Sequence, residues 1–288
     1  MVRDMGRAEG LAEQFGAQTA YDDVDALIRD PEVEAIYVSS PVDLHLEHVL
    51  KAAEAGKHVL CEKPMAMTSE QCQQMITACV GADVTLGVCF VLRGWPIYQR
   101  IKGLIADGHF GTLIELRSHL AKWTPREEGD WRLDPEQSGG GTLIDVATHY
   151  LDLFRFLAGE ITKVAYMGSS RVFNWPVEET AHTLLEFQSG VHGSVTASCT
   201  IPNGSNVLEI FGSEGSLFLG KTLRIVKGAE VLEEEVVFPD YYSGLLEDFA
   251  ASVSGGREPI ACGQDGLQGI RIVEAAYRSE RESRIISL

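Results

Sequence analysis

The chain has 288 residues, with 42 Asp and Glu against 24 Lys and Arg, which gives a formal net charge of -18 at pH 7. That length suits one large or two ordinary domains, and a hydrophobic fraction of 45% is enough to build packed cores. The negative charge would repel phosphate backbones and anionic membranes, and no run of Lys or Arg offsets it. Composition therefore argues against a nucleic-acid-binding or membrane-surface protein.

The sequence also carries no sign of export. No apolar stretch approaches the roughly 18 residues that span a bilayer, and the charged start leads into no apolar segment of a signal peptide. The six cysteines form no Cys-x-x-Cys pair. We expect them to be reduced and mostly buried, as in a cytoplasmic protein.

The first ninety residues alternate between helical and strand patterns. Apolar runs such as Ala35–Val38 are typical of strands buried on both faces of a parallel sheet. Repeated βα units with short connections predict a doubly wound parallel sheet. The predicted strands cover residues 35–38, 58–61 and 85–90, and the predicted helices cover residues 7–15, 24–29, 44–55 and 69–80.

The pattern changes after Arg93. Short alternating strands, broken by Gly, Asn and Pro, predict an antiparallel sheet over residues 161–237. The predicted fold is therefore α/β, with a Rossmann-type dinucleotide-binding domain over residues 1–90 and an α+β domain with a large, mostly antiparallel open sheet over residues 91–288. The remaining predicted elements are a strand at 112–121 and helices at 96–107, 142–157, 245–253 and 266–281.

Glu62-Lys63-Pro64 follows directly on a predicted buried strand. The carboxyl ends of parallel strands are where open α/β sheets bind ligands. A partly desolvated lysine at such a position suits proton transfer or the binding of a substrate hydroxyl. By itself, however, this tripeptide is more often a surface lysine in a turn.

A second motif is Gly139-Gly140-Gly141, which precedes a predicted helix with Asp145 and His149 one turn apart on the same face. The glycines let the backbone approach a ligand closely, and burial in an apolar helix should perturb both ionisable groups. Two other interpretations stay open. The pair could be a hydrogen-bonded structural pair, or two metal ligands without an evident third.

Two weaker patterns complete the set. Ser40, Pro41 and His45 link a predicted strand to a predicted helix, as an anion or dinucleotide contact would. Residues 215–222 match the P-loop expression G-x-x-x-x-G-K-[ST], but their inner positions are largely apolar and Thr222 begins another strand pattern. We interpret that match as a β-hairpin and not as a triphosphate site.

Taken together, these segments resemble the Gfo/Idh/MocA family of glucose–fructose oxidoreductase and inositol dehydrogenase. The resemblance runs through nearly the whole chain. Each motif is weak alone, but their order and spacing are specific. The segments that carry the resemblance are residues 40–45, 55–64, Arg93, residues 131–141, Asp145 with His149, residues 210–215 and residues 274–279.

The resemblance implies hydride transfer between NAD or NADP and a secondary carbinol of a sugar, inositol or related polyol. By position, Lys63 would contact both the nicotinamide ribose and the substrate hydroxyl. His149 would accept the proton during oxidation, and Asp145 would position the substrate or the imidazole. An imidazole suits this step because it changes its charge near neutral pH.

The same resemblance implies the other binding residues. No metal is expected, and the open sheet would form the interface of a homodimer or homotetramer. The expected cofactor contacts are Ser40, Pro41, His45, Glu62, Lys63 and Arg3. The expected substrate contacts are Arg93, Trp131, Arg132, Asp145 and His149, with Tyr241 and Tyr242 as further candidates.

The chain also departs from the family pattern. No G-x-G-x-x-G fingerprint occurs, and residues 1–4 resemble the end of a second strand, so about 30 residues, one βα unit, are expected to be missing. That loss predicts weak cofactor binding, with a non-catalytic cofactor- or sugar-sensing relative as the alternative function. Arg3, near where the adenosine ribose is normally bound, favours NADP. Val91 replaces an asparagine that relatives often carry, which removes one expected substrate hydrogen bond.

Overall fold

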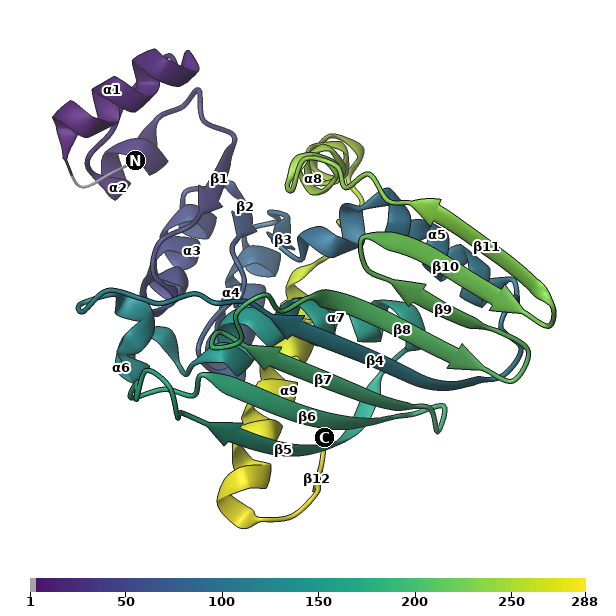
Figure 1. The fold of residues 1–288 in the computed structure, drawn as a ribbon. Coiled ribbons are helices and arrows are strands. Elements are labelled where there is room, and N and C mark those ends of the chain that lie inside the picture. Colours follow the sequence, from purple (N-terminus) through teal and green to yellow (C-terminus); the bar gives the residue numbers. More distant parts are fainter. Residues whose placement is uncertain (1–3) are drawn as a thin grey trace.

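Two β-sheets of different kinds organise the computed structural model, which describes residues 4–288 (Figure 1). The first is the predicted parallel sheet, in the order β1-β2-β3. Its third strand is shorter than predicted because the chain turns into a 3₁₀ helix at Val91–Gly94. The elements are β1 (Ala35–Val38), β2 (His58–Cys61), β3 (Leu86–Val88), α1 (Met5–Phe15), α2 (Val24–Arg29), α3 (His45–Glu54) and α4 (Ser69–Gly81).

Local sequence signals set the ends of these elements. The Thr68 side chain accepts a hydrogen bond from the Gln71 amide and so begins α4. Gly16 ends α1 in the left-handed conformation at φ 70°, which glycine adopts without steric cost. In the middle strand β2, Val59 and Leu60 are buried on opposite faces, as a central parallel strand requires.

The second sheet has nine strands within the described residues, in the order β11-β10-β9-β8-β4-β7-β6-β5-β12. Neighbouring strands are antiparallel except for β4 and β7, which are parallel. The predicted open, mostly antiparallel sheet is therefore confirmed. The strands are β4 (Leu113–Ala121), β5 (Ile161–Ser169), β6 (Thr180–Phe187), β7 (His192–Ser198), β8 (Asn206–Gly212), β9 (Ser216–Leu219), β10 (Thr222–Lys227), β11 (Glu230–Glu235) and β12 (Ile286–Ser287).

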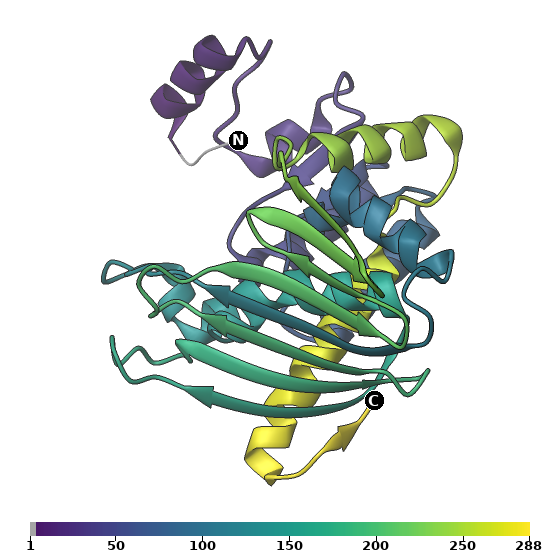
Figure 2. The same ribbon diagram turned by 45° about the vertical axis from the view of Figure 1, so that its right-hand side comes forward.

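One face of this sheet packs against helices, and over the other face no helix of residues 4–288 lies (Figure 2). The covering helices are α7 (Thr148–Ala158) and α9 (Gly263–Glu282). In the same part of the chain, no helix is long and apolar enough to cross a membrane. The other helices are α5 (Pro96–Ala106), α6 (Pro135–Ser138) and α8 (Ser243–Gly255), with 3₁₀ turns at Val42–Leu44 and Trp131–Leu133.

Two segments differ in how well they match the sequence interpretation. Residues 215–222 form the hairpin of β9 and β10, so the interpretation of the P-loop-like match is confirmed. The helix predicted over residues 142–157 is confirmed, but its first turn is not an α-helical one. Leu143–Ala147 form a π-helical turn, and α7 begins at Thr148. π-helical turns are rare in proteins, and those that occur are often found at functional sites.

The cysteines are free thiols, and five of the six are buried, as expected. Burial raises the pKa of Cys72 to about 12 and that of Cys79 to about 11. These two thiols therefore stay protonated at neutral pH and act as small apolar side chains of the core.

Helix α9 joins the two sheets. It packs against α4 and β3 on one side and against β5 on the other. Glycines at its start allow this close approach: a Cβ atom on Gly266 would lie 2.4 Å from the Met65 sulfur, and one on Gly263 would lie 2.9 Å from a Leu86 methyl group. A larger side chain at either position would push α9 away from the first sheet.

A buried arginine reinforces this junction. Arg93 is 6% exposed, and its Nε and Nη2 atoms donate to both oxygens of Asp152 at 2.9 and 2.7 Å. Its Nη1 and Nη2 atoms donate to both oxygens of Asp265 at 2.9 and 2.8 Å, and Nη1 also donates to the Ile260 carbonyl. All five N–H groups of a guanidinium are then used. The expected contact of Arg93 with substrate is therefore corrected, because no donor is left for one.

The partners of Arg93 are themselves buried. Burial raises the pKa of Asp152 to about 6, although Arg93 favours its ionised form. Arg155 adds a second cation, 3.3 Å from Asp265, and binds Glu160 through Nε and Nη2. The network links the 3₁₀ turn after β3 to α7 and to the start of α9.

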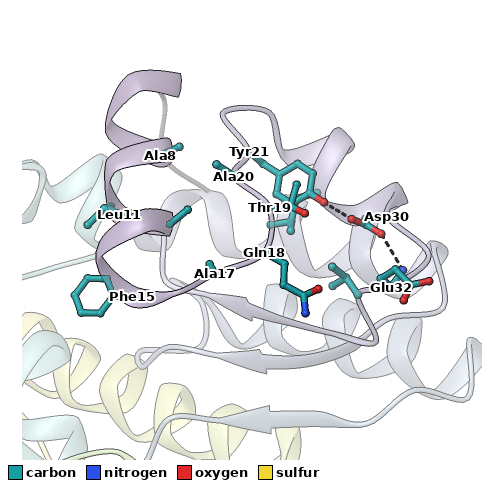
Figure 3. A pocket seen from close by; sticks show the side chains of 13 residues that line it. Ala8, Leu11, Phe15, Ala17, Gln18, Thr19, Ala20, Tyr21, Asp30 and Glu32 are labelled. Carbon is teal, nitrogen blue, oxygen red and sulfur yellow. Dashed lines mark hydrogen bonds between the residues drawn. The ribbon is translucent and has the colours of Figure 1, made fainter.

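A separate hollow of about 510 Å³ lies between α1 and residues 17–33 (Figure 3). Much of its lining is apolar, including Leu11 and Phe15. The Tyr21 hydroxyl donates to Asp30, whose other oxygen accepts from the Glu32 amide. Tyr21 and Asp30 are thus engaged with each other, and most of the remaining lining is apolar, so this hollow is a weaker candidate for an active site than the strand ends of the first sheet.

Replacing Arg93 with Met should destabilise the fold strongly. The change leaves Asp152 and Asp265 without the guanidinium that compensates them, and breaking a buried ion pair in this way costs about 3–5 kcal/mol. Urea unfolding measures the loss. Arg117→Met is the matched control, since Arg117 is 46% exposed and pairs only with surface glutamates. Equal stabilities of the two variants would contradict the role given to Arg93.

Candidate active site

A cleft of about 770 Å³ opens at the carboxyl ends of all three parallel strands. Ser39 and Ser40 follow β1, Glu62 and Lys63 follow β2, and Cys89 follows β3. This is the edge at which open α/β sheets bind ligands. The second half of the chain supplies the opposite wall, with Trp131, Arg132, Asp145, His149, Tyr241 and Tyr242.

His45 holds the two strand-end loops together. Its Nε2 atom lies 2.9 Å from the Ser40 carbonyl, and its Nδ1 atom lies 3.1 and 3.2 Å from the Pro64 and Met65 carbonyls. The side chain is 1% exposed, and burial lowers its pKa. His45 lines the cleft as expected, but both of its ring nitrogens are engaged with backbone carbonyls.

Glu62 accepts hydrogen bonds from hydroxyl groups in both halves of the chain. Its Oε1 atom accepts from Tyr37 at 2.5 Å and from Tyr242 at 3.1 Å, while Oε2 accepts from the Lys63 amide. The bond from Tyr242 spans the cleft, because Tyr242 stands at the start of α8 and Glu62 follows β2. Glu62 thereby fixes the turn from which Lys63 projects.

Lys63 and Asp145 form the central ion pair of the cleft. The Lys63 Nζ atom donates to the Asp145 carbonyl at 2.6 Å and to Asp145 Oδ1 at 3.2 Å. Both side chains are largely buried, with 15% and 25% exposed. The ammonium group is therefore held at two points of the π-helical turn, in a fixed position on the cleft wall.

The second oxygen of Asp145 binds Arg126, which the sequence reasoning missed. Arg126 Nη2 lies 2.6 Å from Asp145 Oδ2, and Nη1 lies 3.2 Å from Asp130. Arg132 is more distant, with Nε 3.9 Å from the same oxygen. Burial alone would raise the pKa of Asp145, but Lys63, Arg126 and Arg132 outweigh it and hold that pKa below its usual range. Asp145 is thus an anion at neutral pH.

His149 follows Asp145 by four residues, and its imidazole ring is neutral at neutral pH. Burial lowers its pKa to about 3, with repulsion from Lys63 adding to the effect and Asp145 opposing it. Its Nδ1 atom is buried without a hydrogen-bond partner in the described residues. No hydrogen bond joins Asp145 to His149 among residues 4–288, so the interpretation as a hydrogen-bonded structural pair finds no support. A neutral imidazole can accept a proton, but a pKa of about 3 makes this ring a weaker base than the imidazole titrating near neutral pH that the sequence led us to expect.

A partly buried carboxylate, that of Glu178, positions the π-helical turn. Glu178 accepts hydrogen bonds from the Gly141 and Leu143 amides at 3.0 and 2.9 Å and from the Tyr277 hydroxyl at 2.9 Å. A Cβ atom on Gly141 would lie 2.2 Å from the Glu178 carbonyl, so only glycine fits there. The triple glycine therefore allows two segments of the protein to approach each other closely. Glu178 is a positioning residue that the sequence reasoning did not identify.

The cleft brings together most of the residues predicted from sequence. Ser40, Pro41, His45, Glu62, Lys63, Trp131, Arg132, Asp145 and His149 all line it, and so do Tyr241, Tyr242 and Val91. Arg132 stacks over the Trp131 ring at 4.4 Å. Arg93 lies outside the cleft, and Arg3 lies outside the described residues. No group of three or more His, Cys, Asp or Glu residues in positions 4–288 could hold a metal ion.

Comparison with known families and sequences gives a consistent result. Residues 1–90 match the model of an oxidoreductase family with an NAD-binding Rossmann fold, and residues 98–218 match the GFO/IDH/MocA C-terminal domain. The chain is 33% identical to a 1,5-anhydro-D-fructose reductase of Ensifer adhaerens, over 94% of this chain and 85% of that protein. It is 30% identical to a scyllo-inositol 2-dehydrogenase (NAD(+)) of Bacillus subtilis, over 98% and 86%.

Solved structures of similar fold cover the chain almost completely. An aldose-aldose oxidoreductase from Caulobacter crescentus, complexed with glycerol, has a TM-score of 0.90 at 29% identity and covers 99% of this chain and 89% of that one. A levoglucosan dehydrogenase in complex with NADH has a TM-score of 0.91 at 25% identity and covers 99% and 88%.

Replacing Arg126 with Gln should raise the pKa of Asp145, because a guanidinium in contact favours the carboxylate. Arg132→Gln is the matched control: it removes a cation from the same oxygen at 3.9 Å in place of 2.6 Å and should have a smaller effect. Titration of the labelled aspartate carboxyl carbons by NMR measures both shifts. A larger shift in the Arg132 variant would overturn this account.

Replacing His149 with Gln should make the free energy of unfolding fall less steeply as the pH is lowered. The pKa of His149 in the folded chain is about 3, below the ordinary 6.5 that an unfolded chain has, so acid favours the unfolded state. The stability that the neutral ring provides is present above pH 6.5 and is lost as the pH falls toward 3, by at most about 1.4 kcal/mol per pH unit.

Urea unfolding at about pH 7.5 and about pH 5.5 checks this, with a difference near 1 kcal/mol expected between wild type and variant. His109→Gln is the control, since His109 lies in the turn between α5 and β4, away from the cleft. An unchanged pH dependence in the His149 variant would show that the ring is not held neutral.

Proposed function

Since the chain belongs to the Gfo/Idh/MocA oxidoreductase family, we propose that it transfers a hydride between NAD or NADP and a secondary carbinol of a sugar, inositol or related polyol. One observation carries the proposal. Lys63, Asp145 and His149 meet in the cleft at the carboxyl ends of the parallel strands, with Asp145 ionised and His149 neutral. These are the protonation states that oxidation of an alcohol requires.

The cleft fits a nicotinamide cofactor in its position and in its donors. Ser40, Pro41, Glu62 and Lys63 would hold it at the strand ends, in a cleft of about 770 Å³. When bound, the oxidised nicotinamide accepts the hydride that leaves the carbinol carbon. Tyr242, whose hydroxyl reaches Glu62 from the opposite wall, would cover this side of the cleft.

His149 and the charged residues around it would then carry out the proton transfer. His149 would take the hydroxyl proton as general base, because its imidazole is neutral and its ring lines the cleft. Lys63 would stabilise the negative charge that develops on the substrate oxygen. Asp145 would fix the Lys63 ammonium, and Arg126 would keep Asp145 ionised while Lys63 is engaged with substrate.

We further propose that the chain works in the cytoplasm as a homodimer or homotetramer. Six free thiols support a reducing compartment. Met167 and Leu184, 73% and 62% exposed, lie on the uncovered face of the nine-stranded sheet and support pairing of two copies there.

Replacing Lys63 or His149 with Ala should lower kcat by about 10²–10⁴, the usual contribution of a positioned acid or base. Reduction of NAD⁺ and NADP⁺ is followed with a panel of sugars and inositols. Lys51→Ala and His109→Ala are the controls, because both side chains lie outside the cleft and outside the strands of the second sheet. Titration with NADH confirms that the His149 variant still binds cofactor.

Two results would contradict the proposal. Near-normal kcat in both cleft variants would remove the roles of Lys63 and His149. Binding of NADH without turnover of any alcohol would leave a cofactor-sensing relative as the function.

A further inference from the structure

One segment beside the catalytic cleft has no part in the proposed proton transfer. Residues 236–242 lead from β11, at the edge of the second sheet, to α8, which packs against the 3₁₀ turn after β3 (Figure 1). In the described chain, no backbone N–H of residues 237–241 donates to another backbone group. Side-chain contacts therefore decide where this segment lies.

Two contacts fix the backbone on both sides of Tyr242. The Trp95 indole N–H donates to the Tyr241 carbonyl at 3.1 Å. On the other side, a Cβ atom on Gly244 would lie 2.5 Å from the Gly94 carbonyl oxygen, so the start of α8 packs directly on the turn after β3. The Tyr242 side chain can therefore rotate while the backbone around it stays in place.

The hydroxyl of Tyr242 ties the two walls of the cleft together. It donates to Glu62 Oε1 at 3.1 Å, and Glu62 stands on the opposite wall, directly after β2. Burial and the Glu62 carboxylate raise the pKa of Tyr242, so the phenol stays protonated and remains a donor at neutral pH. A hydrogen bond to a carboxylate is stronger than one between neutral groups. The bridge therefore favours a closed position of the Tyr242 ring.

This bridge lies beside a second one. The next residue along the chain, Lys63, also reaches the second half, where its Nζ atom lies 2.6 Å from the Asp145 carbonyl. Two consecutive residues of one turn thus connect the parallel sheet to the second half of the chain, and the proposed cofactor site lies between the connected walls. Lys63 serves the substrate oxygen. The bridge from Tyr242 contacts no group to which we assign proton transfer, which points to a role in binding.

We propose that Tyr242 is a gate for the nicotinamide cofactor. With its hydroxyl on Glu62, the ring closes the cleft beside the dinucleotide, and rotation of the side chain opens the cleft for entry and release. The inference rests on the cofactor placement of the proposed function and adds a step before and after hydride transfer. A gate is closed with and without cofactor, so it slows entry as well as release, whereas a simple contact with the cofactor slows release alone.

Replacing Tyr242 with Phe tests the gate, because the ring stays and only the bridge is lost. Association of NADH is followed by stopped-flow fluorescence, and its release by displacement with excess NAD⁺. We expect kon and koff both to rise about fivefold, the effect of one lost hydrogen bond to a carboxylate, while Kd changes by less than about twofold. The readout is binding, so it does not depend on which alcohol the protein oxidises.

Tyr37→Phe is the matched control. Tyr37 donates to the same Glu62 oxygen, at 2.5 Å, but it belongs to β1 and does not cross the cleft, so its loss should leave kon unchanged. Three results would overturn the gate: unchanged rates in the Tyr242 variant, a rise of koff alone with a weaker Kd, or equal rises of both rates in the two variants. Absence of NADH binding to the unaltered chain would instead remove the proposed function and the gate together.

Discussion

The geometry of the cleft depends on one buried guanidinium. Arg93 leaves the first sheet in the turn after β3 and donates to carboxylates on α7 and α9, both from the second half of the chain. Helix α7 carries His149, so the distance between that ring and Lys63 on the first sheet is set through this junction. Since the pairing is bidentate on both carboxylates, it fixes orientation as well as distance. The cost is the burial of a carboxyl group, Asp152, whose pKa is raised to about 6.

Charge in the cleft is arranged so that each ionisable group has one fixed state. Asp145 sits between two cations and stays an anion, while the nearby Lys63 and the apolar surroundings keep His149 neutral. A hydrogen bond donated by the imidazole to the Asp145 carboxylate would favour the imidazolium form. No such hydrogen bond is present among the described residues, and Asp145 is paired with Arg126 instead. The His149 imidazole therefore stays unprotonated and can accept a proton.

The sequence was sufficient for the features that depend on local pattern. Apolar runs and glycine or proline ends located the strands of both sheets, and strand ends placed Lys63 in the cleft. Arg126 and Glu178 were missed because their partners lie 19 and 37 residues away along the chain and are reached from loops without periodicity. The role of Arg93 was misjudged since a lone arginine does not reveal which carboxylates surround it. The π turn was hidden because one extra residue in a turn leaves an apolar helical pattern almost unchanged.

The position of α9 has a consequence for the order in which the protein is built. This helix supplies Asp265 to the arginine, and its first glycines pack on Met65, in the loop after β2, and on Leu86 of β3. During synthesis on the ribosome, the strands of the parallel sheet are made about two hundred residues before α9. Helix α9 can cover the sheet only after those intervening residues have been added. The apolar residues of the sheet stay open to chaperones and to other nascent chains for that interval, and the contacts that close them span about two hundred residues.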